Sequence, residues 1–179
     1  MTFGGSLYID KADFLEVAPN KKFRRLSVGA EVRLRGAYVI RCDEVIKDAA
    51  GEIVELRCTY DPESGGGKTS DGRKVKGIIH WVSAGHAVTS EVILYDHLFA
   101  SPDPEEGDDY LAHLNPDSRQ VVSARLEPAL ASASPGEVVQ FERLGYFCND
   151  PVRAADGAPA FHRTVGLRDT WGKIEKKGS

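Results

Sequence analysis

The sequence predicts an all-β protein. Its apolar residues occur in short runs rich in Val, Ile, Leu, Tyr and Phe, and clusters of Asp, Gly, Ser and Pro separate these runs. No repeat of fixed period is visible. Many short strands joined by turns are typical of β-barrels and β-sandwiches, whereas β/α folds need helical patterns between their strands.

We expect seven strands, because each segment is rich in apolar residues and is bounded by residues that favour turns. In chain order these are Leu7–Ile9, Glu31–Ile40, Ile53–Tyr60, Gly77–Val82, Glu91–Leu94, Val121–Leu126 and Val138–Glu142. The clearest turn signals are Asp48–Gly51, Asp61–Gly67, Asp71–Gly72 and Ser132–Gly136. Ala12–Val17 and Tyr110–Leu114 are each expected to form one or two helical turns.

Composition narrows the class of protein. At 179 residues, with 41% hydrophobic and 28% charged residues, the chain can bury the core of one domain or of two small ones. No apolar run has the length of a membrane span, and the N-terminus lacks the order of a signal peptide. Three widely spaced cysteines, Cys42, Cys58 and Cys148, argue against a disulfide framework or a zinc ribbon and suit a reducing cytosol.

The distribution of charge favours a polyanionic partner, although the net charge is −4. The segment Lys21–Arg41 holds seven basic residues and one acid, whereas Asp103–Asp109 holds only acids among its charged residues. Phosphate binding needs a local basic stripe rather than a basic average. The segment Lys21–Arg41 is therefore a candidate nucleic-acid contact.

Arg33 and Arg35 alternate with Val32 and Leu34 in a predicted strand, so the two guanidinium groups are expected to share one face while Val32 and Leu34 face the core. Guanidinium groups bind phosphate through two donors, stack on bases and donate to base edges. The alternative is a solvated strand face balanced by acids on a neighbouring strand. Arg24 and Arg25 lie just upstream.

The segment Gln140–Arg143 is the second candidate contact. In strand register Gln140 and Glu142 point to one side and Phe141 points to the core. An amide that donates and accepts, next to a carboxylate that only accepts, can read the edge of a base. The alternative is an exposed strand with a Glu–Arg pair.

Other motifs do not support an enzyme on their own. Gly65–Thr69 imitates the end of a phosphate-binding loop, but the required earlier glycine is replaced by Pro62, so we expect a mobile hairpin tip instead. The five histidines lack clustered partners for a metal site. Ser83, His86 and Asp96 lack the glycine-flanked turn of a hydrolase nucleophile. Cys148 is expected to be a buried thiol. His80-Trp81 is expected to close a barrel core or to buttress the interface between barrels.

Three motifs resemble one known family. Lys74–His86 (KVKGIIHWVSAGH), Gln140–Phe147 (QFERLGYF) and Arg163–Trp171 (RTVGLRDTW) resemble, in this order, the carboxy-terminal anticodon-binding region of glutaminyl-tRNA synthetases. The resemblance implies two stacked six-stranded β-barrels, with the distal barrel inserted into the proximal one. On this basis residues 19–99 form the distal barrel, and residues 1–18 and 100–179 form the proximal barrel. The interruption at Ser101–Gly107 fits a boundary near Phe99.

The resemblance also implies an RNA-binding set: Lys22, Arg24, Arg25, Arg33, Arg35, Gln140, Glu142, Arg143, Arg168 and Thr170. Glutamine anticodons have the form YUG. The central U is expected near Gln140, Glu142 and Arg143, with Arg168 and Thr170 at the same end. The final G is expected near Arg24 and Arg25, and the first base near Arg33 and Arg35. Sequence-specific RNA recognition mostly targets such unstacked loop bases.

The family's nucleotide-binding signatures, a His-Ile-Gly-His-like tetrapeptide and a Lys-Met-Ser-Lys-Ser-like loop, are absent from the sequence. We therefore expect the catalytic domain of a cytoplasmic, class I, ATP- and Mg-dependent ligase to lie elsewhere in a parent polypeptide. The chain itself is then a catalytically inactive and monomeric partner of glutamine tRNA that needs no cofactor and binds neither DNA nor membrane.

Three alternatives remain open. One is the equivalent region of a glutamyl-tRNA synthetase of the archaeal and eukaryotic type, which uses a similar pair of barrels. A protein-interaction barrel without RNA affinity would bind no tRNA in a salt-dependent manner. A small hydrolase would need a nucleophile and a base in a concave site.

Overall fold

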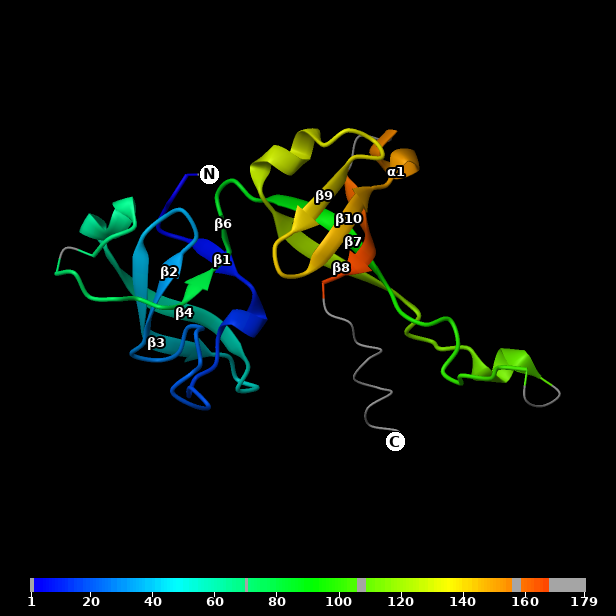
Figure 1. The fold of residues 1–179 in the computed structure, drawn as a ribbon, viewed down its shortest axis with the longest axis horizontal. Coiled ribbons are helices and arrows are strands. Elements are labelled where there is room, and N and C mark those ends of the chain that lie inside the picture. The colour runs from blue at the N-terminus through cyan, green and yellow to red at the C-terminus, as the bar shows by residue number, and fades with distance from the viewer. Residues whose placement is uncertain (1, 70, 106–108, 156–158, 168–179) are drawn as a thin grey trace. The chain divides into compact units, whose positions relative to one another are not determined.

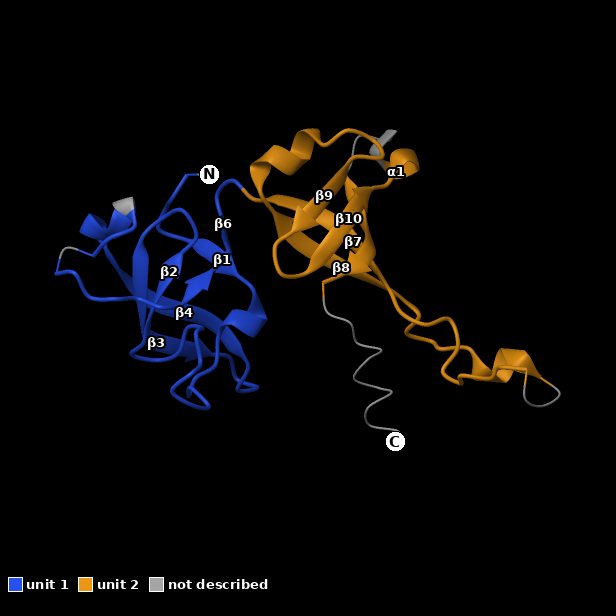
Figure 2. Ribbon diagram, viewed as in Figure 1, with its two compact units in different colours: residues 1–86 blue, residues 87–179 orange. Residues whose placement is uncertain are grey.

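The computed structural model describes residues 2–69, 71–105, 109–155 and 159–167 (Figure 1). The chain folds as two compact units, residues 1–86 (unit 1) and residues 87–179 (unit 2; Figure 2). The described ranges contain strands, short 3₁₀ helices and one five-residue α-helix. The predicted all-β class is therefore confirmed.

The boundary between the two units lies at His86–Ala87. The resemblance instead implies an inserted barrel, residues 19–99, within a discontinuous one made of residues 1–18 and 100–179. That discontinuous arrangement stays a prediction, and each unit has its own sheets and its own core.

Unit 1 contains two sheets. Its elements are β1 (Leu7–Ile9), the 3₁₀ helix η1 (Lys11–Asp13), β2 (Glu31–Leu34), β3 (Val39–Lys47), β4 (Ile53–Asp61), the 3₁₀ helix η2 (Pro62–Gly66), β5 (Ile78–Ile79) and β6 (Trp81–Ser83). The larger sheet has the order β4-β3-β2-β5, in which β2 and β5 run parallel, and β1 pairs with β6 in the smaller sheet. Val32 and Leu34 are buried in the core of unit 1, as the alternation along β2 predicted. Leu26, Ile79 and Trp81 belong to the same core.

Unit 2 is built on one five-stranded sheet. Its elements are β7 (Val88–Tyr95), η3 (Tyr110–His113), β8 (Arg119–Leu126), η4 (Pro128–Ser132), β9 (Val138–Phe141), β10 (Gly145–Asn149), α1 (Pro151–Ala155) and β11 (Ala160–Gly166). The strand order is β8-β7-β11-β10-β9, and only the β11–β7 pair among these is parallel. The core packs Phe147 against Phe141, with ring centroids 4.2 Å apart, and includes Phe161 and Val92.

Two predicted strands are each broken in the structure. Glu31–Ile40 is a hairpin rather than one strand, because the chain turns at Gly36, whose φ of +66° suits glycine. Gly77–Val82 divides at His80, since β5 joins the larger sheet while β6 pairs with β1. The elements β10, α1, η4 and β11 were not predicted at all.

The segment Gly65–Thr69 is not the tip of a hairpin, because the strands before and after it, β4 and β5, lie at opposite edges of the larger sheet. Pro62–Gly66 forms η2, and Ser64 within it is fully buried. The Ser64 hydroxyl accepts from the Val39 N–H at 2.8 Å and donates to the Asp61 carbonyl at 2.6 Å. These bonds hold η2 against the start of β3.

The buried thiol is Cys42 rather than Cys148. Cys42 is fully buried in unit 1, and burial raises its pKa, so the thiol stays protonated and unreactive. Cys148 is only half-buried. Cys148 lies on the face of β10 that is turned towards solvent, between the buried residues Phe147 and Asn149. Its aromatic neighbours in the sequence gave no sign of this.

Asn149 joins three segments of unit 2 from a fully buried position. Its Nδ2 donates to the carbonyls of Ala133 and Ser134 at 2.9 and 3.2 Å, and its Oδ1 accepts from the Ala160 N–H at 3.3 Å. Asn149→Ala would remove all three bonds from a fully buried position, so we expect a loss of about 2–3 kcal/mol in the free energy of unfolding. Urea unfolding measures it. Asn115→Ala, at a half-buried site, should cost less, and equal costs would contradict this role.

Candidate nucleic-acid interface

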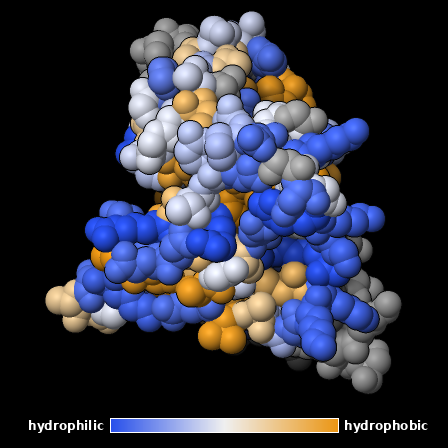
Figure 3. Space-filling view, turned by 90° about the vertical axis from the view of Figure 1, so that its left-hand side faces the viewer, coloured by the Kyte–Doolittle hydropathy of each residue, from blue (hydrophilic) through white to orange (hydrophobic). Residues whose placement is uncertain are grey.

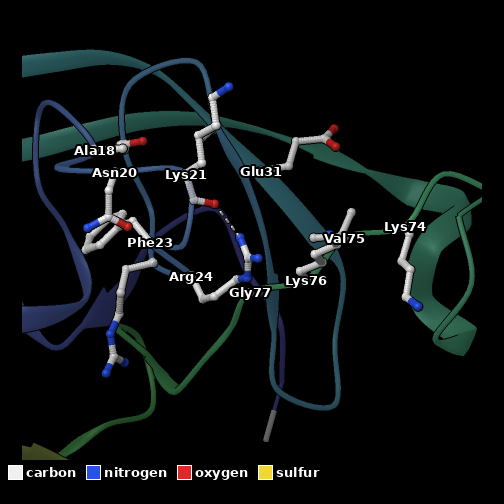
Figure 4. Close-up of a pocket in the computed structure, with 13 residues that line it drawn as sticks. Ala18, Asn20, Lys21, Phe23, Arg24, Glu31, Lys74, Val75, Lys76 and Gly77 are labelled. Carbon is white, nitrogen blue, oxygen red and sulfur yellow. Dashed lines mark hydrogen bonds between the residues drawn. The ribbon is translucent and has the colours of Figure 1, made fainter.

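A basic cavity of about 320 Å³ lies in unit 1 (Figure 4). Its charged lining consists of Lys21, Arg24, Arg25, Lys74, Lys76 and Glu31. The side chain of Phe23 adds an aromatic surface to the lining. Five bases, one acid and an aromatic ring are the combination that binds phosphates and bases of a single strand.

The backbone of the segment 20–25 is shaped by local hydrogen bonds. The Asn20 side chain accepts from the Lys22 N–H at 2.9 Å, and the Asn20 carbonyl accepts from the Phe23 N–H at 3.1 Å. The guanidinium of Arg24 donates to the Lys21 carbonyl at 3.0 Å, as the dashed line in Figure 4 shows. This tight turn brings Lys21 and Arg24 to the same cavity.

Gly77 sets the opposite wall of the cavity. A Cβ at this position would lie 2.7 Å from the Arg24 carbonyl oxygen and 2.9 Å from Cγ1 of Val32. Only glycine allows β5 to come this close to the Arg24 backbone. This close approach is the physical reason why a glycine, Gly77, stands in the motif Lys74–His86 just before β5.

Glu31, the acid of the lining, is paired with Arg73, which does not line the cavity. Arg73 donates to both carboxylate oxygens of Glu31 at 2.9 Å, and also to Asp61 at 3.0 Å and Asp71 at 2.9 Å. The Arg73 backbone N–H, with its guanidinium, holds the pKa of the Asp71 carboxyl below its usual value. Because Glu31 is paired in this way, its charge does not cancel that of the lysines and of Arg24 in the lining.

Arg25 has a structural partner. Its guanidinium forms an ion pair with Asp13, whose side chain is only 1% exposed, at the end of η1. A buried carboxylate requires such a counter-charge. Arg25 therefore lines the cavity while it also holds η1 to the segment that carries Leu26.

Arg33 and Arg35 differ in their surroundings. The Arg33 guanidinium donates to the carbonyls of Ser64 at 2.7 Å and Ala37 at 3.3 Å, which ties it to η2. Arg35 lies beyond the end of β2, in the turn, and is exposed. The Arg33 N–H donates to the Gly77 carbonyl at 2.8 Å and the Arg35 N–H to the Ile79 carbonyl at 3.0 Å. That the two side chains share one face stays a prediction.

The second predicted contact lies on the β9–β10 turn of unit 2. The Leu144 N–H donates to the Phe141 carbonyl at 2.9 Å, which closes the turn around Glu142 and Arg143. Gln140 is exposed on β9, and Phe141 packs inward as predicted. Glu142 is part of the turn rather than of the strand.

Arg143 has a φ of +66°. Among the described residues it is the only non-glycine residue with a positive φ. A left-handed backbone costs an arginine of order 1 kcal/mol, and such strain gathers at functional sites. The strain is therefore a reason to keep this turn as a candidate site. Arg168 and Thr170 lie outside the described residues.

Phe23, Lys74 and Lys76 belong to the cavity but were not among the predicted contacts. Lys74 and Lys76 stand within the motif Lys74–His86, whose alternation of lysine and valine was the available signal. Because they are far in sequence from Lys21–Arg25, the sequence did not show that they line the same cavity.

Figure 3 shows that hydrophilic residues cover most of the displayed face, with smaller apolar areas between them.

The alternative site chemistries find little support. The Ser83 hydroxyl lies 3.2 Å from Nδ1 of His86, but Ser83 is buried and the Asp96 carboxylate accepts from the His97 N–H. Among the described residues, His, Cys, Asp and Glu do not gather in groups of three that could hold a metal ion. Helices in the same ranges are too short and too polar to serve as membrane spans.

The fold and the basic cavity define a β-sheet protein with a candidate RNA-binding surface. Two family models, both described as tRNA synthetases class I (E and Q), anti-codon binding domain, match residues 1–61 and 78–150. The chain belongs to this family of anticodon-binding domains. The resemblance noted in the three motifs is thereby confirmed.

Curated relatives give the same result. The chain is 54% identical over 177 residues to a glutamine–tRNA ligase of Nitrobacter hamburgensis, 56% over 176 residues to one of Pseudomonas putida and 51% over 172 residues to one of Escherichia coli. These alignments cover 99%, 96% and 96% of this chain. They cover 31% of each relative, so the chain spans about a third of the length of these relatives.

Proposed function

We propose that this chain is the anticodon-binding module of a glutamine–tRNA ligase and reads the YUG anticodon of glutamine tRNA. The observation that supports it most is identity of 51–56% to glutamine–tRNA ligases over nearly the whole chain. The alternative glutamyl-tRNA synthetase is not favoured, because these relatives are all glutamine–tRNA ligases. The sheets of units 1 and 2 would belong to the two β-barrels that the resemblance implies.

In this proposal the cavity of unit 1 receives the final G of the anticodon. Arg24 would donate to the O6 and N7 acceptors of guanine, and Phe23 would offer a ring for stacking. Lys21, Lys22, Lys74 and Lys76 neutralise neighbouring phosphates. Arg25 lines the same cavity and holds its wall in place through the ion pair with Asp13.

The remaining bases would be bound at other places on the same chain. Arg33 and Arg35, at the end of β2, would contact the first base. The turn with Gln140, Glu142 and Arg143, together with Arg168 and Thr170, would read the central U. Splayed bases lose their stacking, and separate contacts of this kind compensate for that loss.

The ligase activity itself is proposed for a cytoplasmic parent protein that carries a catalytic domain and uses ATP and Mg. This chain would supply recognition of the anticodon to that domain, as a monomer. The interaction-barrel alternative predicts no salt-dependent binding of RNA to the cavity.

Titration with two fluorescent anticodon stem-loops tests the proposal, one carrying CUG and one with the U and G replaced. We expect a preference for CUG that persists as salt rises, because base-edge contacts release few counterions. Gln140→Ala should reduce this preference about tenfold. Lys21→Ala should weaken both stem-loops equally and lower the salt slope by about 1.

Lys11→Ala is the matched control, because the Lys11 side chain is 93% exposed and lies outside the cavity lining. It should change neither affinity nor preference. Equal binding of both stem-loops at every salt concentration would contradict anticodon reading. Absence of binding to either one would favour the interaction barrel.

A further inference from the structure

Tyr146 stands on the solvent face of β10, at the end of the sheet where the β9–β10 turn lies. Its neighbours in the strand, Gly145 and Phe147, are buried, whereas Tyr146 is 42% exposed. This alternation means that β10 has one face in the core and one face towards solvent. The aromatic side chain of Tyr146 is therefore not needed to fill the core.

Tyr146 lies at the centre of a row across three strands. Its cross-strand partner on β9 is Gln140, and its partner on β11 is Val165, where the register with β11 shifts between Tyr146 and Phe147. Side chains directly opposite one another on the same face have Cβ atoms about 4.5–5.5 Å apart. Gln140 and Val165 are both exposed, so the row presents an amide, a phenol ring and an apolar flank to solvent.

The core uses a separate set of aromatic rings on the opposite face. Phe147 stacks on Phe141, and Phe161 packs beside Phe141 with ring centroids 5.5 Å apart. These contacts explain why the core of unit 2 is complete without Tyr146. An exposed tyrosine can also be an ordinary strand residue that stabilises a sheet by cross-strand packing, and variants at this position separate that role from binding.

We propose that the ring of Tyr146, with Val165 beside it, is the stacking platform for the central base of the anticodon. The proposal rests on the proposed function and adds a residue that the sequence did not suggest. A base stacked on this ring turns its edge towards neighbouring side chains of the same face, and the nearest amide is that of Gln140. Arg143 lies in the turn that joins the same two strands, within two residues of Gly145.

The ring of Tyr146 and the polar groups of Gln140 and Arg143 would have different roles in binding. Stacking on an aromatic ring tolerates any base, because every base has a π-face. An amide and a guanidinium select a base by its donors and acceptors. Tyr146 would therefore supply affinity, and Gln140 and Arg143 would supply the choice of U. A strand within the sheet suits this purpose, because the backbone that carries the ring does not need to be ordered when RNA binds.

The test uses the full 179-residue chain and a CUG stem-loop with 5-fluorouridine at the central position. Tyr146→Leu should weaken binding about tenfold for the CUG stem-loop and for the replaced stem-loop alike. Tyr146→Phe keeps the ring and should bind within about twofold of the original chain. The fluorine resonance should shift on binding through the ring current, and the shift should be lost in Tyr146→Leu but kept in Tyr146→Phe.

Tyr110→Leu is the control, because Tyr110 is an exposed tyrosine of η3. It should bind as the original chain does. Thermal unfolding shows whether Tyr146→Leu remains folded, and a purely structural tyrosine would alter unfolding without altering the fluorine shift of the bound RNA.

The outcomes separate this inference from the proposed function. If the original chain prefers CUG and Tyr146→Leu binds the CUG stem-loop as tightly, the stacking platform is overturned and anticodon reading stays intact. Equal losses in Tyr146→Leu and Tyr146→Phe would also overturn it, because the hydroxyl would then be responsible. Absence of any CUG preference in the original chain would instead contradict the proposed function.

Discussion

Gly145→Ala is expected to destabilise unit 2 by about 4 kcal/mol and to remove recognition of the central anticodon base. A Cβ at Gly145 would lie 2.3 Å from the carbonyl oxygen of Val165 and 3.3 Å from its carbonyl carbon. Both are backbone atoms of the paired strand β11, so no side-chain rotation can relieve the overlap. The φ of +155° at Gly145 adds backbone strain for any other residue.

The consequence for binding follows from the position of Gly145. It begins β10 directly after the turn that carries Glu142 and Arg143, and it pairs with Phe141 on β9. A displaced β10–β11 pair therefore moves the turn as well as Tyr146. Urea unfolding gives the loss of stability, and the CUG stem-loop titration gives the loss of preference.

Gly85→Ala is the matched control for this variant. Apart from Gly85 itself and its two chain neighbours, no heavy atom lies within 4 Å of a Cβ built at Gly85, and its φ is not positive. We expect its free energy of unfolding to stay within about 0.5 kcal/mol of the original value. A Gly145→Ala chain as stable as this control would show that β11 moves aside without cost.

Arg25→Ala is expected to destabilise unit 1 by about 3–5 kcal/mol, because it leaves the buried carboxylate of Asp13 without its ion-pair partner. An RNA-binding defect in this variant would then arise from an altered wall of the cavity. This is the reason why a loss of binding in Arg25→Ala is not by itself evidence of contact with RNA.

Two comparisons test the role of Arg25. Arg24→Ala removes the neighbouring exposed arginine, which donates only locally to the Lys21 carbonyl. We expect weaker RNA binding with the free energy of unfolding unchanged within about 0.5 kcal/mol. The double variant Arg25→Ala/Asp13→Asn should recover part of the lost stability, because the buried charge that Arg25 compensated is then removed as well.

The opposite pattern would assign Arg25 to the RNA. If Arg25→Ala unfolds at the same urea concentration as the original chain and yet loses binding to the stem-loop, its guanidinium acts on the ligand and Asp13 is stabilised by other groups. The measurement is thus decisive for one residue that the resemblance placed at the final G.

Local patterns succeeded where a residue's neighbours in the chain decide its environment. The alternation of Val32 and Leu34 predicted their burial, and Phe141 was correctly assigned to the core. The strand Leu7–Ile9 was predicted with its observed bounds. Local patterns failed at Gly36 and His80, where one apolar run contains a turn or passes from one sheet to another.

The candidate site shows the same limit. The basic segment Lys21–Arg25 was visible as a run of charges, but Lys74 and Lys76 meet it only because β5 pairs with β2. The structural role of Arg25 depends on Asp13, twelve residues earlier in the chain. Pairing between strands that are distant in sequence leaves no local signal.

By itself, the sequence determined the all-β class, the inward faces of β2 and β9, the basic stripe and, through three motifs, the family of anticodon-binding domains. Only the tertiary structure decided which arginines are engaged in holding the fold and which lysines complete the cavity. It also placed Tyr146 opposite Gln140. The physical reason is that composition and periodicity report the burial of a side chain, whereas charge pairing and cross-strand contact depend on which strands lie side by side.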